Sequence, residues 1–325
     1  MAGVSGAKRA QQTAFVGYPL DFSGQWRMRN RVQRVWDIPH ATWFTLMGIG
    51  GGVFVLSRLM GISHDLGLWF GLPAVDIVSF VVIGIGGLVL IADLGKPFRF
   101  IRALINVRTS WISRGAIADF VFLILATLLI LPNLKIGSAM PLSALPWESE
   151  AISGLGRFFE FISIVAAIVV MFYAGAVLSD PKSIPYWNSP LVPAQFLLSS
   201  FAMSAGVLSL FFLAAGKAIG LGLVILEIIF VAFLLVSMLW HLATRRENPA
   251  KRESLFLLLR GRYKGLFLGL TLAAGTVLPL ALSLFAAVWA GARGPMMGIT
   301  AILLFIGGFY LRLLTLRVGI YPPMR

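Results

Sequence analysis

The sequence contains no cysteine and only three histidines among its 325 residues. The lack of cysteine excludes disulfide bonds, thiolate zinc sites, catalytic thiols and iron–sulfur clusters held by this chain. Charged residues are also scarce, at 12% of the chain, whereas hydrophobic residues make up 58%. So much apolar surface cannot be buried in the core of one soluble domain, which excludes a cytosolic enzyme.

Long apolar runs dominate the residues that are present. A helix needs about 20 residues to cross a hydrocarbon layer of about 30 Å. Eight apolar runs approach or exceed that length, at residues 41–60, 70–92, 115–134, 158–178, 191–214, 219–242, 266–289 and 297–316. The runs are continuous instead of alternating, which favours helices over the strands of a membrane barrel. We therefore predict an all-α, polytopic membrane bundle of eight transmembrane helices.

The basic residues are unevenly distributed between the predicted connections. With eight helices, 22 of the 27 Lys and Arg residues fall on one side, if Arg312 near the end of the last span is included. The other side holds only Arg58, Lys135, Arg157, Lys217 and Arg293. Because basic residues are retained on the cytoplasmic side, we expect both termini to be cytoplasmic, in a prokaryotic inner membrane. The net charge of +14 then indicates contact with anionic membrane lipids and not with nucleic acid.

Three regions follow from this topology. Residues 1–40 form a basic cytoplasmic tail without a cleavable signal peptide, residues 41–317 the membrane domain, and residues 318–325 a short cytoplasmic end. From Trp26 to Trp36 the tail alternates apolar and basic residues, which predicts either an interfacial amphipathic helix or a disordered tether. The long outer connection 132–156, with Trp147 and Glu148, is expected to dock a partner or to form a solvated cap.

Several ionisable side chains lie at one predicted depth near the outer surface. They are Arg58, His64, Asp65, Asp76, Glu160 and Lys217. Ionisable groups at membrane depth are costly and often functional. We interpret them as an outer pocket in which a quinone headgroup is held by hydrogen bonds and exchanges protons. The alternative is that Glu160 and Lys217 only extend into the lipid headgroup region.

Three intramembrane carboxyl groups could form a proton relay: Asp76, Asp119 and Glu227. Glu227 lies near the middle of a span, where desolvation disfavours a charged carboxylate. The alternative for Glu227 is a protonated side chain bonded to a serine such as Ser204 or Ser209. For Asp119, pairing with Arg114 or another cytoplasmic arginine is favoured over a relay role.

The histidines offer little support for haem, although a membrane haem typically needs two facing histidine ligands. Only His40 and His241 lie at the same predicted end of the helical bundle, and histidine is common at membrane interfaces. We expect no metal site, haem or iron–sulfur cluster in this chain. Without such a group the chain is non-catalytic on its own, and redox activity requires a diffusible lipid carrier and a partner protein.

The second predicted span ends in the segment 93–100, which reads Asp-Leu-Gly-Lys-Pro-Phe-Arg-Phe. This segment resembles the signature of the NrfD-type family, the membrane subunits of polysulfide-reductase-like complexes. The matching positions are Asp93, Gly95, Lys96, Pro97 and Arg99. Gly95 and Pro97 suit the end of a helix, and Asp93 is placed to pair with a nearby basic residue. Segments 110–115, 173–193 and 307–312 are similar to further family motifs in the same order.

The resemblance covers roughly residues 40–320 and implies an eight-helix subunit that binds menaquinone or ubiquinone near its outer face. It also implies an iron–sulfur partner subunit at that face, which exchanges electrons with a catalytic subunit, often of the molybdopterin type. The quinone ligands cannot be transferred by residue, because the matching motifs lie mainly at the inner face. An ion-coupled secondary transporter using Glu227 and Asp119 is the alternative, but the inverted repeats that it predicts are not evident.

Overall fold

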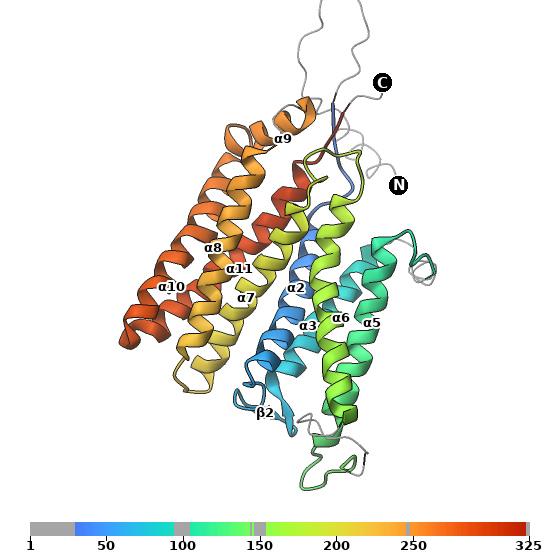
Figure 1. The fold of residues 1–325 in the computed structure, drawn as a ribbon, viewed down its shortest axis with the longest axis vertical. Coiled ribbons are helices and arrows are strands. Elements are labelled where there is room, and N and C mark those ends of the chain that lie inside the picture. Colours follow the sequence, from blue (N-terminus) through green and yellow to red (C-terminus); the bar gives the residue numbers. More distant parts are fainter. Residues whose placement is uncertain (1–29, 94–104, 144, 146–153, 245–247, 323–325) are drawn as a thin grey trace, which may run out of the picture. The chain divides into compact units, whose positions relative to one another are not determined.

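The computed structural model describes residues 30–93, 105–143, 145, 154–244 and 248–322. Eight helical spans within these ranges are long and apolar enough to cross a membrane. They are α2 (Ile38–Leu59), α3 (Ala74–Asp93), α5 (Trp111–Ile130), α6 (Gly154–Ser179), α7 (Leu191–Ala214), α8 (Leu221–Ala243), η4 (Gly265–Val277) continued by α10 (Leu278–Val288), and α11 (Arg293–Arg317) (Figure 1). The predicted all-α bundle of eight spans is confirmed, and the chain is a multi-pass membrane protein.

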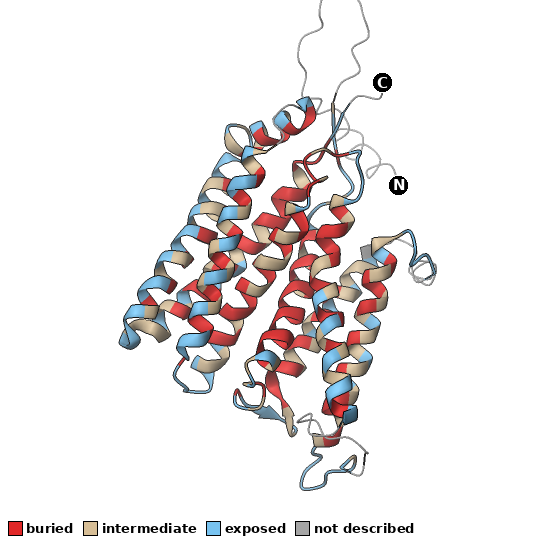
Figure 2. Cartoon of the chain, in the orientation of Figure 1, coloured by how far each residue is buried: buried red, intermediate tan, exposed pale blue. Residues whose placement is uncertain are grey.

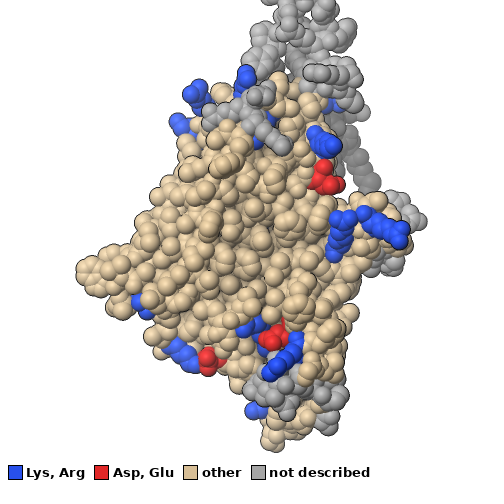
Figure 3. All heavy atoms as spheres, in the orientation of Figure 1, with Lys and Arg blue, Asp and Glu red and all other residues tan. Residues whose placement is uncertain are grey.

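Short elements close the two ends of the bundle. The end that we call the basic end carries α9 (Pro249–Leu259) and the antiparallel pair of β1 (Arg31–Val32) and β4 (Ile320–Tyr321). The opposite end, which we call the hairpin end, carries the antiparallel pair of β2 (Leu68–Trp69) and β3 (Leu72–Pro73). It also carries the short helices η3 (Leu131–Asn133) and η5 (Ala290–Ala292). On the face shown in Figure 3, charged residues gather toward the two ends, with an uncharged belt between them.

Helix α2 lies at the centre of the packing, because it contacts α3, α6, α7 and α11. Most of its residues are buried (Figure 2), including four glycines between residues 48 and 52. An added Cβ at Gly50 would lie 2.8 Å from the Ser79 carbonyl oxygen of α3, and one at Gly51 would lie 3.1 Å from that of Ala167 in α6. These small residues allow neighbouring backbones to approach α2 closely, as is typical of membrane helix interfaces.

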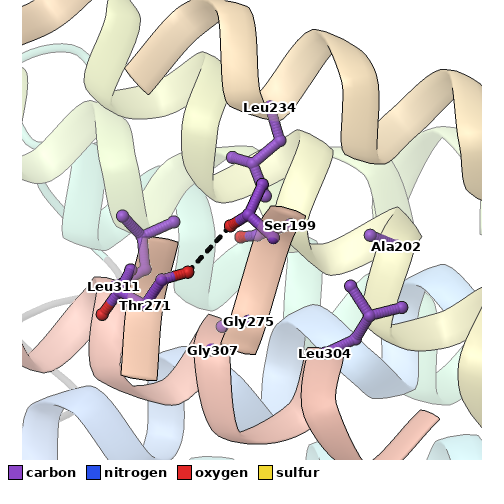
Figure 4. A pocket seen from close by; sticks show the side chains of 10 residues that line it. Ser199, Ala202, Leu234, Thr271, Gly275, Leu304, Gly307 and Leu311 are labelled. Atoms are coloured by element: carbon purple, nitrogen blue, oxygen red, sulfur yellow. Dashed lines mark hydrogen bonds between the residues drawn. The ribbon is translucent and has the colours of Figure 1, made fainter. Parts of the chain in front are cut away.

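The seventh span is irregular, since its first half, η4, is a π-helix. π-helical turns are rare and frequently occur at functional sites. A narrow gap between η4, α7, α8 and α11 adjoins this segment and is lined by residues that include Ser199, Thr271 and Leu304 (Figure 4). The gap is too narrow for a water molecule, so it reflects the irregular packing around η4 and is not a ligand site.

The predicted amphipathic helix in the tail is wrong for the part that the structure describes. Arg31 and Val32 form β1, and helical structure begins at Ile38. Trp26 and Met28 lie outside the described residues. The extended conformation arises because β1 pairs with β4, which satisfies backbone groups that a helix would otherwise satisfy internally. The first spanning helix, α2, begins at Ile38, three residues before the predicted start at residue 41.

Gln33 joins the segment before α2 to the end of α11. Its Nε2 donates to the carbonyl oxygens of Trp36 at 2.7 Å and Leu316 at 2.8 Å. Its Oε1 accepts from the N–H groups of Val35 at 3.0 Å and Trp36 at 2.9 Å. The side chain is only 7% exposed, so these partners have little access to water.

Replacing Gln33 with Leu should therefore lower the free energy of unfolding by about 3 kcal/mol, because several shielded backbone groups lose their partner. Unfolding of the purified protein in detergent micelles would measure the loss. Gln195→Leu is the matched control, since the side chain of the buried Gln195 makes one hydrogen bond among the described residues, to the Ser237 carbonyl oxygen at 3.1 Å. Equal losses in the two variants would contradict the role assigned to Gln33.

Candidate functional site

Three of the predicted outer side chains meet at the hairpin end. Arg58 lies in the last turn of α2, Asp76 in the first turn of α3, and Glu160 in α6. The Arg58 guanidinium forms a close ion pair with the Asp76 carboxylate through Nη2 and Oδ2. Its Nη1 lies 3.9 Å from Oε1 of Glu160. One arginine thus contacts two carboxylates from two other helices.

The Arg58–Asp76 pair is almost completely shielded from solvent. Exposure of the two side chains is 4% and 0%, whereas Glu160 is 24% exposed. The guanidinium also lies over the Phe54 ring, 5.5 Å from its centroid. Shielding costs desolvation free energy for both ions, and breaking such a pair leaves an uncompensated buried charge. The two buried charges therefore depend on each other, and Glu160 is the most exposed of the three charged side chains.

Two polar atoms near this ion pair lack hydrogen-bond partners in the part of the chain that the structure describes. They are Oδ1 of Asp76 and Nε2 of His64, both shielded from solvent. His64 is close enough to Asp76 for the two side chains to interact electrostatically. Buried polar groups are normally hydrogen-bonded, so an unpaired acceptor and an unpaired imidazole nitrogen together indicate a place for a polar ligand group.

The β2–β3 hairpin leads directly into the first turn of α3 and so positions Asp76. Phe70 at its tip adopts a positive φ of 54°, which is unusual for a bulky residue. The tip is fixed by the connection after η3, since the Lys135 N–H donates to the Phe70 carbonyl oxygen at 2.7 Å. Trp69 and Phe70 are 50% and 77% exposed. The hairpin therefore presents aromatic side chains to the surroundings next to the ion pair.

Asp65 and Lys217 form an ion pair with each other and with none of Arg58, Asp76 and Glu160 among the described residues. Lys217 Nζ is 3.9 Å from Asp65 Oδ1, and both side chains are well exposed, at 47% and 65%. Exposed ion pairs contribute little free energy. Of the six side chains predicted for the outer pocket, the structure thus brings together Arg58, Asp76 and Glu160, places His64 nearby, and pairs the other two with each other.

Asp119 does not pair with Arg114, the first of the arginines suggested for it, whereas Arg99 and Arg102 lie outside the described residues. Arg114 donates to the carbonyl oxygens of Val107 and Arg108, both at 2.9 Å, and its guanidinium lies over the Trp111 ring. These local acceptors occupy the guanidinium at the start of α5. Asp119 lies further along the helix, close enough to Tyr173 of α6 for electrostatic interaction. Its Oδ1 is buried and has no hydrogen-bond partner within the described ranges.

Glu227 accepts a hydrogen bond from a serine, but the serine is neither of the two that were suggested. Ser283 Oγ of α10 lies 2.7 Å from Glu227 Oε1. Ser204 donates to the Ile49 carbonyl oxygen and Ser209 to that of Ala205, each at 3.0 Å. A serine partner is thus present as suggested, but the two serines named as examples lie on α7, whereas Glu227 faces α10.

The three carboxyl groups of the expected relay lie in separate surroundings. In the described ranges no hydrogen bond or ion pair joins any two of Asp76, Asp119 and Glu227. Aromatic rings pack near Arg58 on α2, α3 and α5, with the Phe122 centroid 5.0 Å from that of Phe54 and 5.7 Å from that of Phe80. Within the described residues, direct contacts do not join these carboxyl groups into a continuous polar chain.

Arg312 is a buried charge that the sequence interpretation placed at the membrane surface. It is 1% exposed and lies between α11, α7 and α2. Its Nη2 donates to Ser200 Oγ at 2.7 Å and to the Phe196 carbonyl oxygen at 3.1 Å. Gly48 of α2 leaves room for the guanidinium, because an added Cβ there would lie 2.9 Å from Nη2. The sequence contained one sign of this burial. Arg312 lies four residues after Gly308, and therefore on the closely packed face of α11.

The two histidines considered for haem are surrounded by aromatic side chains at the basic end. The His40 ring centroid lies 4.6 Å from that of Trp36, and the His241 centroid lies 4.7 Å from that of Tyr186. Burial raises the pKa of Tyr186, which lies in the connection between α6 and α7. Across the described residues, no group of three or more His, Asp or Glu side chains is arranged to hold a metal ion.

Part of the predicted sequence motif lies outside the described residues. Asp93 is the last residue of α3, whereas Gly95, Lys96, Pro97 and Arg99 fall in the range 94–104. Trp147 and Glu148 in the long connection also fall outside.

Comparison with known proteins agrees with this architecture. The family model described as "Polysulphide reductase, NrfD" matches residues 25–322. The C subunit of the polysulfide reductase of Wolinella succinogenes is 28% identical over 179 residues, which cover 53% of the present sequence and 56% of that protein. Protein NrfD of Escherichia coli is 25% identical over 186 residues, which cover 53% and 58%. The matched region thus spans little more than half the length of these relatives. Because the family model extends over nearly the whole membrane bundle, the chain belongs to the polysulphide reductase NrfD family.

Proposed function

We propose that this chain is the quinone-reactive membrane subunit of a respiratory oxidoreductase, with the quinone headgroup bound beside Arg58, Asp76, Glu160 and His64. The observation that carries the proposal is the shielded Arg58–Asp76 ion pair with two unpaired polar atoms next to it. A headgroup has two oxygens that can accept or donate hydrogen bonds. His64 Nε2 can donate a hydrogen bond to the headgroup, and Asp76 Oδ1 can accept one from it.

The cluster is suited to proton exchange at the headgroup. Oxidation of a quinol to a quinone releases two electrons and two protons, and carboxylates within hydrogen-bond reach can accept the protons. Arg58 pairs with the Asp76 carboxylate and offsets part of the cost of burying its charge, so that Asp76 can serve as a proton acceptor. Glu160 is the most exposed member of the cluster and can pass the proton to the surface. We therefore expect protons to be exchanged at the hairpin end.

The electrons require a partner, because the chain has no cysteine to hold an iron–sulfur cluster. We propose an iron–sulfur subunit at the hairpin end and a catalytic subunit beyond it, of the molybdopterin type. The excess of basic residues supports a cytoplasmic location for residues 1–40 and 318–325, so that the hairpin end faces outward. Menaquinone or ubiquinone would serve as the lipid carrier.

We favour this function over an ion-coupled transporter that uses Glu227 and Asp119. Glu227 contacts α10, whereas Asp119 faces Tyr173 of α6. No hydrogen bond or ion pair links the two carboxyl groups in the described ranges. The Arg58 cluster, in contrast, joins three helices through direct contacts between charged groups.

Replacing His64 with Ala should raise the KM for quinol about tenfold, which corresponds to the loss of one hydrogen bond. Lys217→Gln is the matched control, because its exposed ion pair with Asp65 does not include Arg58, Asp76 or Glu160. Quinol oxidation by the intact complex in vesicles would measure both variants. An unchanged KM in His64→Ala, or equal changes in the two variants, would contradict the assigned pocket.

A further inference from the structure

The headgroup site at Asp76 needs an exit for the rest of the quinone. A membrane quinone carries a long apolar isoprenoid tail, which cannot replace the polar partners of the charged side chains Arg58, Asp76 and Glu160. Because Arg58 and Asp76 are almost completely shielded from solvent, the tail has to leave the site between spanning helices. The residues of α3 that follow Asp76 indicate which side of that helix the tail can follow.

Asp76, Phe80, Gly84 and Gly87 lie along one face of α3. Residues three or four positions apart share a face of an α-helix, and these residues are separated by four, four and three positions. Asp76 lies in the first turn, at the hairpin end, and Gly87 lies about 16 Å further along the helix axis. The face therefore runs from the Asp76 carboxylate, whose Oδ1 has no hydrogen-bond partner among the described residues, toward the membrane interior.

Phe80 indicates that this face is directed at neighbouring helices and not at the bulk lipid. Its ring centroid lies 6.4 Å from that of Phe54 in α2 and 5.7 Å from that of Phe122 in α5. The well-exposed large apolar side chains of α3 form a separate row, with the same spacing of three or four positions: Val81, Ile85 and Leu88. Gly84 and Gly87 thus continue the face that begins between α2 and α5.

The two glycines leave space on this face. Apart from the adjoining part of α3 itself, no described atom lies within 4 Å of a Cβ added at Gly84 or Gly87, although both residues are only partly exposed. Gly86 differs, because a Cβ added there would lie 3.1 Å from Met47 Cγ and 3.5 Å from the Trp43 carbonyl oxygen of α2. Glycine in a spanning helix normally permits such close packing. Packing accounts for Gly86 but not for Gly84 and Gly87, where an apolar chain can lie against the backbone.

We propose that the face of α3 carrying Phe80, Gly84 and Gly87 binds the isoprenoid tail of the quinone whose headgroup lies at Asp76. This inference rests on the proposed quinone function and specifies the tail-binding part of that site. The Phe80 ring supplies an apolar contact where the tail leaves the headgroup, and the two glycines give room to the units that follow. A phospholipid acyl chain has the same apolar character, and only the quinone tail makes quinol oxidation depend on this face.

The test compares a quinol that has a long isoprenoid tail with duroquinol, which has no tail, as substrates of the intact complex in vesicles. Gly84→Leu and Gly87→Leu should each raise the KM for the long-tailed quinol about tenfold, because the leucine side chain fills the space beside α3. The KM for duroquinol should stay unchanged in both variants. Gly269→Leu is the matched control and should alter neither KM, because Gly269 also has no described atom within 4 Å of an added Cβ but lies in η4.

An unchanged KM for the long-tailed quinol in both α3 variants, or an equal rise for the two quinols, would overturn the tail-binding face while leaving the headgroup site in place. Failure of the wild-type complex to oxidise either quinol would overturn the proposed function itself, and the tail-binding face with it.

Photolabelling provides a second measurement that needs no substitution in the protein. The probe is a quinone with a photoreactive diazirine in the first part of its tail, used on the intact complex with and without excess unlabelled quinone. We expect the label that excess quinone prevents to be attached to α3 or α5. Competitive labelling confined to the spans from α8 to α11 would overturn the proposal.

Discussion

Replacement of Arg58 with Gln should abolish quinol-dependent electron transfer, lowering turnover by the intact complex at least about 100-fold. The substitution removes the only basic group in contact with Asp76 in the described structure and leaves that buried carboxylate without compensation. Asp76 would then take up a proton and could no longer accept one from the headgroup. Turnover with a soluble quinol analogue, measured in membranes containing the whole complex, would give the rate.

The loss must be separated from misfolding, since an unpaired buried charge destabilises a protein by about 3–5 kcal/mol. The double variant Arg58→Gln/Asp76→Asn removes both charges and should fold normally while remaining inactive. Arg293→Gln is the matched control, because Arg293 also lies at the hairpin end but donates to the carbonyl oxygens of Ala286 and Ile219. Wild-type turnover in Arg58→Gln, or an equal loss in Arg293→Gln, would contradict the proposed role.

Replacement of Gly307 with Ala should lower the free energy of unfolding by about 3 kcal/mol. This is the upper end of the usual cost of inserting a methyl group into a well-packed interior. Gly307 of α11 faces Gly275 of η4, and an added Cβ would overlap the Gly275 Cα and lie 2.8 Å from its carbonyl oxygen. These are backbone atoms that cannot rotate away, so α11 and η4 would have to separate. Unfolding in mixed micelles, together with the yield of folded protein, would measure the effect.

Gly269→Ala is the control for this prediction, since Gly269 lies in the same π-helix with no atom within 4 Å of an added Cβ. Its effect should stay within about 1 kcal/mol, the usual difference between glycine and alanine in a helix. Equal losses of stability in the two variants would show that the contact between Gly307 and Gly275 is not the cause of the destabilisation.

The number and limits of the spanning helices could be predicted from sequence because bilayer thickness imposes a length on apolar segments. The predicted range 191–214 coincides with α7 (Leu191–Ala214). Hydropathy does not detect elements that depend on tertiary contacts. The strands β1 and β4 are short and gain their hydrogen bonds only from each other, far apart in the sequence. The π-helical form of η4 is likewise not indicated by the hydropathy of its residues.

The candidate site could be predicted in part, because charged residues at one membrane depth are few. Depth alone grouped Asp65 and Lys217 with Arg58, Asp76 and Glu160, although these two form an exposed ion pair with each other. Direction around a helix decides such contacts, and it becomes predictable only when the neighbouring helices are known. The same limitation assigned Glu227 a partner on α7 instead of Ser283 on α10, and placed Arg312 at the surface instead of among α2, α7 and α11.

The central claim, a quinone headgroup beside Arg58 and Asp76, is tested most directly by photolabelling the intact complex with an azido-quinone and mapping the labelled peptides. We predict that the label attaches near the end of α2, the start of α3 or the first turns of α6, and that excess natural quinone prevents labelling. The Arg58→Gln/Asp76→Asn variant should lose most of the label. Competitive labelling confined to the basic end, or undiminished labelling of the double variant, would contradict the assigned site.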